Sequence, residues 1–122
     1  MKNYGLIGCG MMGHEHIKNI NLLPEGRVSV VFDPMPDLAE SASKLAEGAA
    51  IADTLDDLLA YEELDAVVIV SPNYLHVEQL REIVTKRPLP ILCEKPLYTM
   101  PEQKAELDAL FEGYEHLSLI HI

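Results

Sequence analysis

The sequence predicts an α/β fold: a single domain built on a doubly wound parallel sheet. Three observations support this prediction. Strand-like and helix-like segments alternate along the chain, residues 66–70 are apolar without polar alternation, and a glycine-rich turn separates the first strand from the first helix. Alternation favours a parallel sheet covered by helices on both faces, and an unbroken apolar run is typical of a central strand buried on both faces.

Each element has its own signal. Strands are predicted at residues 4–7, 28–32, 66–70 and 91–93, with a weaker one at 49–52. Helices are predicted where apolar residues recur at helical spacing. These stripes are Gly13, Ile17 and Ile20; Leu38, Ala42, Leu45 and Ala46; Leu80, Ile83 and Val84; and Leu107, Leu110 and Phe111. Thr54 and Asp57 have the spacing of a helix-capping box. Thr99 and Glu102 repeat that spacing, with Pro101 early in the helix.

Length and charge restrict what the chain can be. A chain of 122 residues suffices for one domain with a core but is short for two domains of ordinary size. Nine basic against twenty acidic residues give a formal charge of -11, which argues against nucleic acid or an anionic membrane as partner. No apolar stretch approaches the roughly 18 residues of a membrane helix. The first strand begins too early for a signal peptide, so we expect a cytoplasmic protein.

A glycine pattern follows the first predicted strand. Gly8-Cys9-Gly10-Met11-Met12-Gly13 stands between a strand and a helix, the context in which such a pattern binds the phosphates of a dinucleotide. A pyrophosphate needs backbone N–H donors at contact distance, and Gly8 and Gly10 carry no side chain to obstruct it. Gly13 lies on the buried helix face, where its missing Cβ lets the helix approach the sheet. This is the fingerprint of a Rossmann-type nucleotide-binding domain.

Asp33 supports that interpretation. It ends the second predicted strand, twenty positions after Gly13, where an acidic residue hydrogen-bonds a ribose 2′-hydroxyl. The same carboxylate would repel a 2′-phosphate, and no Arg or Lys follows nearby to offset it. The pattern therefore favours NAD over NADP, with NADP not excluded. The alternative is that Asp33-Pro34 merely starts a turn.

Two further segments are expected beside the nicotinamide half of the cofactor. In the strand order 3-2-1-4-5, that half crosses toward strands four and five, and ligands bind at the carboxyl ends of the strands. The candidates are Ser71, Pro72, Asn73 and His76 after the fourth strand, and Glu94, Lys95 and Pro96 after the fifth. Lys95 could stabilise charge on a substrate oxygen or transfer its proton. The alternative is a surface lysine paired with Glu94.

Other reactive residues are interpreted as structural. Cys9 and Cys93 would end strands two positions apart, about 9–10 Å, which exceeds disulfide reach, so both are expected to be reduced and apolar. His14 and His16 do not share a helix face, and no metal site is predicted. His16 and His76 are expected to be hydrogen-bonded structural residues or to lie beside the cofactor.

These motifs resemble the Gfo/Idh/MocA family of NAD(P)-dependent oxidoreductases, up to about Glu115. The matching elements are the glycine loop with His16, then Asp33, then Pro72-Asn73 with His76, and then Glu94-Lys95-Pro96. The resemblance implies that Lys95 is the catalytic or substrate-binding lysine and that Pro96 shapes the turn beneath the nicotinamide. It also implies a dehydrogenase or reductase acting on a hydroxyl or carbonyl carbon of a sugar, cyclitol or related small molecule.

The chain is expected to be a fragment of such an enzyme. Residues 1–116 would form the NAD(P)-binding Rossmann domain, while the C-terminal substrate domain of the family, which also supplies much of the homo-oligomer interface, is absent. Residues 117–122 are either a truncated sixth strand or a non-native tail, since they also match one reading frame of a transposon end. The fragment alone would lack turnover. The functional alternatives are an NAD(H)-sensing module without catalysis and a Rossmann-like domain that binds no nucleotide.

Overall fold

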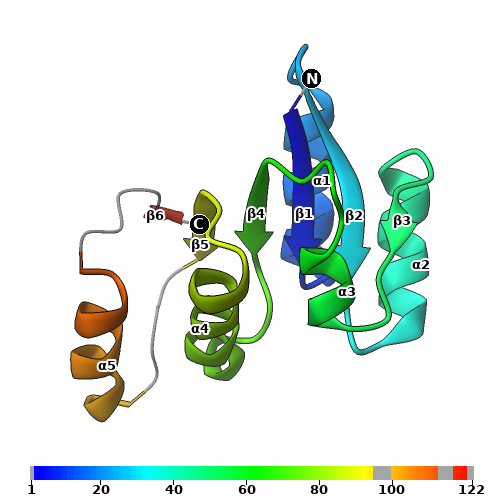
Figure 1. The fold of residues 1–122 in the computed structure, drawn as a ribbon. Helices are drawn as coiled ribbons and strands as arrows, with labels where there is room; N and C mark the ends of the chain where they lie inside the picture. The colour runs from blue at the N-terminus through cyan, green and yellow to red at the C-terminus, as the bar shows by residue number, and fades with distance from the viewer. Residues whose placement is uncertain (1, 95–99, 113–116, 121–122) are drawn as a thin grey trace.

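The computed structural model describes residues 2–94, 100–112 and 117–120. Within these ranges the strands form one six-stranded sheet in the order β3-β2-β1-β4-β5-β6, and every neighbouring pair is parallel (Figure 1). The strands are β1 (Lys2–Ile7), β2 (Gly26–Phe32), β3 (Ala50–Ile51), β4 (Ala66–Ile69), β5 (Ile91–Glu94) and β6 (Leu117–Ile120). The helices are α1 (Met11–Asn21), α2 (Pro36–Leu45), α3 (Leu55–Leu59), α4 (His76–Lys86) and α5 (Glu102–Leu110), with a short 3-10 turn, η1 (Asn73–Leu75), before α4.

Helices cover both faces of the sheet, as the alternation of elements predicts. In Figure 1, α1 lies behind β1 and β2, whereas α3 and α4 lie in front. Successive strand residues point to opposite faces, so Leu6 packs in the core beneath α1 and α2 while Ile7 packs in the core beneath α3, α4 and α5. In β4, Val68 joins the first core and Ile69 the second. The central strand is buried on both faces because each face has its own layer of helices.

The carboxyl ends of the central strands lie level with one another. Ile7 pairs with Phe32 on one side and with Ile69 on the other, and Ile69 pairs with Cys93. The residues that follow these strands therefore emerge at one edge of the sheet. This register brings the glycine loop and the segments after β2 and β4 together.

The five predicted strands and their order are confirmed, and β3 is a strand of only two residues. The Thr54 cap is confirmed too, because the Asp57 N–H donates to Thr54 Oγ1 at 3.1 Å. Thr99 lies outside the described residues. The helix that it was expected to cap begins at Glu102 with Pro101 as its N-cap.

The sixth strand adds one parallel pairing to the predicted sheet. β6 runs beside β5, with Leu117 opposite Ile91 and Ile120 opposite Glu94. Pairing of this kind fits a native strand and a non-native apolar tail equally, so the origin of residues 117–122 stays a prediction. In the described ranges, none of the helices has the length and apolar character needed to span a membrane.

Candidate functional site

The three glycines of the loop after β1 have different structural roles. Gly8 has φ +99°, and a Cβ there would come within 2.5 Å of the Ser71 backbone nitrogen. A Cβ on Gly13 would lie 2.5 Å from the Gly8 carbonyl oxygen, so α1 contacts the loop directly. Nothing lies within 4 Å of a Cβ built on Gly10. Gly8 and Gly13 therefore allow close packing within the protein, while Gly10 leaves open space.

The open space beside Gly10 is at the start of α1. Gly10 is the N-cap of this helix, has an extended conformation, and makes no side-chain cap hydrogen bond. The first N–H groups of a helix have no partner within it, and they carry partial positive charge. This end of α1 is therefore suited to a phosphate group.

Asp33 fastens the glycine loop to the end of β2. Its Oδ2 accepts a hydrogen bond from the Cys9 N–H at 2.8 Å, and its Oδ1 accepts one from the Met35 N–H at 2.8 Å. The bond from Met35 is the one expected if Asp33-Pro34 only starts a turn. The bond from Cys9 shows that Asp33 also holds the glycine loop. Each carboxylate oxygen can accept more than one hydrogen bond, and Asp33 is only partly buried. It can therefore hold the loop and still receive a ligand hydroxyl.

Cys9 lies beneath the loop rather than in the site. It is fully buried, and its thiol is 3.5 Å from the Phe32 carbonyl oxygen. Burial, and then the nearby charge of Asp33, raise the pKa of the Cys9 thiol to about 12, so it is protonated and unreactive at neutral pH. Cys93 is buried as well, and both cysteines are thiols rather than halves of a disulfide, as predicted.

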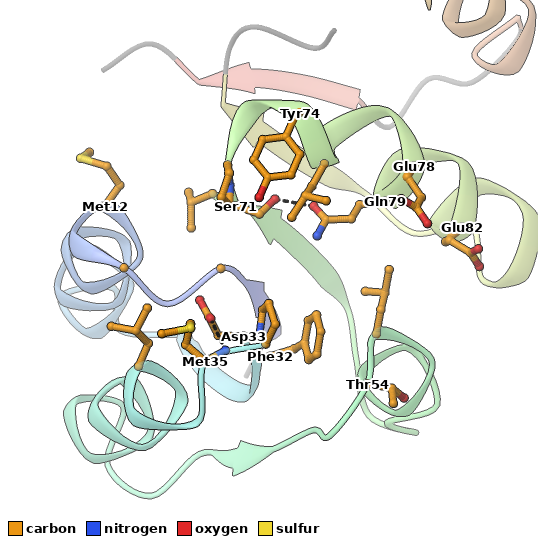
Figure 2. Close-up of a pocket in the computed structure, with 18 of the residues that line it drawn as sticks. Met12, Phe32, Asp33, Met35, Thr54, Ser71, Tyr74, Glu78, Gln79 and Glu82 are labelled. Atoms are coloured by element: carbon orange, nitrogen blue, oxygen red, sulfur yellow. Dashed lines mark hydrogen bonds between the residues drawn. The ribbon is translucent and has the colours of Figure 1, made fainter. Parts of the chain in front are cut away.

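A cavity of about 830 Å³ lies at this edge of the sheet (Figure 2). Its volume is within the range of small-molecule and cofactor sites. The glycine loop, the segments after β2 and β4, and helices α3 and α4 form its walls. The lining residues are Gly8, Gly10, Met11, Met12, Phe32, Asp33, Pro34, Met35, Leu38, Thr54, Leu55, Asp56, Val70, Ser71, Pro72, Tyr74, Leu75, Glu78, Gln79, Glu82 and Lys86.

Most of the predicted site residues that the structure describes line this cavity. Gly8, Gly10, Met11, Met12, Asp33, Ser71 and Pro72 do so. Cys9 and Gly13 are buried behind the loop. The Asn73 and Glu94 backbones are placed, in η1 and β5, whereas Lys95 and Pro96 lie outside the described residues.

His76 lies behind the cavity wall. It is fully buried, with Nε2 2.8 Å from the Ser71 carbonyl oxygen and Nδ1 3.8 Å from Cys93 Sγ. It therefore ties the start of α4 to the end of β4 and to β5. This arrangement fits the expectation of a hydrogen-bonded structural histidine, and the effect of His76 on a cofactor would pass through Ser71.

Sequence reasoning missed the wall formed by α4. Leu75, Gln79, Glu82 and Lys86 recur at positions i, i+4, i+7 and i+11, and all four line the cavity. That spacing places them on one helix face. The spacing is visible in the sequence. It is less prominent than the apolar stripe at Leu80 and Ile83, which indicates only the core side of the same helix.

Acidic side chains dominate the charge of the described cavity wall. Asp33, Asp56, Glu78 and Glu82 line it, against a single cation, Lys86. The Lys86 ammonium lies 2.6 Å from both Asp56 and Glu82, and hydrogen bonds to these two carboxylates raise its pKa to about 12. Two of the four carboxylates are thus neutralised in part by Lys86. Asp33 and Glu78 have no comparable partner in this wall.

The chain matches known proteins over nearly its whole length. The Gfo/Idh/MocA model, an oxidoreductase family with an NAD-binding Rossmann fold, matches residues 2–120. The chain is 39% identical over 101 residues to inositol 2-dehydrogenase 2 of Saccharopolyspora erythraea, covering 82% of this chain and 30% of that protein. It is 33% identical over 117 residues to the rhizopine catabolism protein MocA of Rhizobium meliloti, covering 94% of this chain and 36% of that protein. The chain thus spans about a third of the length of these relatives.

Solved structures share the fold. Myo-inositol dehydrogenase from Lactobacillus casei, in complex with NAD(H) and myo-inositol, superposes with a TM-score of 0.89 at 26% identity, over 98% of this chain and 36% of that one. Myo-inositol dehydrogenase from Corynebacterium glutamicum gives 0.88 at 29% identity, over 98% and 35%. Together with the glycine loop, Asp33 and the cavity at the strand ends, these matches show that the chain belongs to the Gfo/Idh/MocA family of oxidoreductases with an NAD-binding Rossmann fold.

Proposed function

We propose that this chain is the cofactor-binding domain of an NAD-dependent dehydrogenase that oxidises a hydroxyl carbon of an inositol-like cyclitol. The observation that carries the proposal is the glycine loop, which leaves open space at Gly10 beside a large cavity and is bonded to Asp33 through the Cys9 N–H. The relatives named inositol 2-dehydrogenase support the substrate class. Residues 1–116 would form this domain, and a substrate domain elsewhere in the parent protein would complete the enzyme.

The pyrophosphate of the cofactor would lie over Gly10 at the start of α1. Backbone N–H groups at this end of the helix supply donors and partial positive charge. A side chain at Gly10 would project into space that is open in the structure. A large residue there would occupy the position of the phosphates without disturbing the loop itself.

The adenosine ribose would lie against Asp33. This carboxylate faces the cavity and can accept hydrogen bonds from the ribose hydroxyls. A 2′-phosphate would meet the charge of Asp33, while Lys86 is already paired with Asp56 and Glu82. The cavity charge therefore supports NAD rather than NADP as the cofactor.

Lys95 would act on the substrate side of the cofactor. β5 ends at Glu94, immediately before it, at the carboxyl edge where the cavity also lies. The bound nicotinamide supplies the hydride acceptor. A lysine at this position would hold the substrate hydroxyl and help to move its proton as the carbon loses hydride.

Calorimetry of the 122-residue chain with NADH and NADPH tests the binding part of this proposal. We expect NADH to bind and NADPH to bind at least tenfold more weakly, because the cavity wall is acidic. Gly10→Arg should abolish binding without unfolding the protein. Ala105→Arg, the same side chain at an exposed position of α5 outside the cavity, should bind like the wild type. Absence of NADH binding by a folded sample would refute the proposal.

A further inference from the structure

Gln79 is a buried polar residue of the cavity wall for which the proposed function has no role. It lies on α4 and lines the cavity, yet only 7% of its surface is exposed. A primary amide has an oxygen acceptor and a nitrogen with two donors. Burial of such a group is unfavourable unless both ends find partners.

Ser71 is the hydrogen-bond partner of the oxygen end of the Gln79 amide. The Ser71 hydroxyl, itself buried after β4, donates a hydrogen bond to Gln79 Oε1. Figure 2 shows this bond and the amide nitrogen pointing into the cavity. None of the described residues accepts a hydrogen bond from that nitrogen. The wall thus presents an oriented N–H donor that is suited to an acceptor on a ligand.

The surroundings of this donor suit a flat, apolar ring. Phe32 and Leu55 line the same cavity and pack against the core beneath α3 and α4. In Figure 2, Phe32 reaches into the cavity from β2 and Gln79 from α4. Phe32 directly precedes Asp33, and Gln79 enters the same cavity from the facing wall, so a base attached to a ribose at Asp33 would lie between these two walls.

We propose that Gln79 is a specificity-determining residue for the adenine base, with its Nε2 donating a hydrogen bond to a ring nitrogen of adenine. The inference rests on the proposed binding of NAD in this cavity. Adenine ring nitrogens are acceptors. A base that presents an N–H group at the same position would place its own donor against the donor of Gln79 and would bind less well.

The test uses ADP-ribose and three analogues in which N1, N3 or N7 of the adenine is replaced by CH. We expect one analogue to bind the wild-type chain roughly tenfold more weakly than ADP-ribose, the cost of about one hydrogen bond. Gln79→Met, which has similar length and no donor, should weaken ADP-ribose by a similar factor. Gln79→Met should also bind that analogue and ADP-ribose with equal affinity. Gln103→Met, the same change on α5 outside the cavity, should keep the wild-type pattern.

Thermal melting by circular dichroism checks that each variant is folded. If Gln79→Met does not fold, Gln79→Glu replaces it, because its carboxylate can still accept the Ser71 hydrogen bond but cannot donate. Equal binding of all three analogues to the wild type would overturn the inference, and so would a penalty that persists in the Gln79 variant. NADH binding without ADP-ribose binding would overturn it while leaving the proposed function intact. Failure of folded wild type to bind NADH would overturn both.

Discussion

Single residues in the glycine loop differ in what they demand of the backbone. Gly8 combines a positive φ with a Ser71 backbone atom at 2.5 Å from the position of a Cβ, whereas Gly10 has neither constraint. The pattern G-x-G-x-x-G treats both glycines alike. The structure assigns Gly8 to the packing of β1 against the end of β4, and leaves the space beside Gly10 open.

Alanine substitutions separate these two roles. We expect Gly8→Ala to lower the free energy of unfolding by at least about 2–3 kcal/mol, because the Cβ is strained by the positive φ and collides with backbone that cannot move aside. Gly10→Ala should change stability by less than about 0.5 kcal/mol. Urea unfolding followed by circular dichroism measures both. Equal stability of the two variants would contradict the distinction.

At the scale of elements, Arg87 ties the end of α4 to the segment that joins α3 to β4. Its guanidinium donates to the backbone carbonyls of Leu59 at 2.6 Å, of Glu62 at 3.0 Å and of Leu64 at 3.4 Å, and also to that of Tyr61. These are carbonyls at and after the end of a short helix, which lack helical partners. A single side chain thus holds α3, one wall of the cavity, against α4, another wall.

Removing that guanidinium should destabilise the fold more than removing an exposed ion pair. We expect Arg87→Met to cost about 1–2 kcal/mol of unfolding free energy, because several carbonyls lose a charged donor. Arg81→Met, which removes the exposed pair with Glu106, should cost less than about 1 kcal/mol. Both values come from urea unfolding at equal salt. Similar losses in the two variants would show that Arg87 is not a structural tie.

At the scale of the whole molecule, the chain holds a cavity at one edge of a sheet of parallel strands, and it spans about a third of the length of the relatives it matches. The cavity, the glycine loop and the end of β5 share one edge of the sheet. In the proposed enzyme, a substrate domain would close over this edge. Catalysis and NAD sensing, two of the three functions considered from the sequence, differ only in what happens at this edge.

Lys95 distinguishes those two functions in the parent protein. If it is catalytic, Lys95→Ala should lower kcat with an inositol substrate by at least about 100-fold, the contribution typical of a positioned proton-transfer group. NADH affinity should change less than threefold. Lys104→Ala, which removes a lysine from an exposed pair with Asp108 on α5, is the matched control. An unchanged rate in Lys95→Ala would favour the sensing module.

The sequence alone was sufficient for the first five strands and their order. Apolar periodicity located β1, β2, β4 and β5, because burial on one or two faces leaves a direct pattern in the residue types. The glycine spacing and Asp33 located the loop, because close backbone approach and a positive φ restrict the residue to glycine. The capping pair Thr54 and Asp57 could be predicted too, because a helix cap depends on residues that are close together in the sequence.

Tertiary structure alone decided which side chains share the cavity. Gln79 and Phe32 are far apart in the sequence and line the same cavity only because α4 packs near the sheet edge where β2 ends. His76 carried the same motif signal as Ser71, yet packing placed it behind the wall and Ser71 within it. Local spacing determines which face of a helix or strand a residue occupies. What that face meets depends on long-range packing. For this reason the sequence indicated the edge of the sheet at which the cavity lies but not the side chains that form its walls.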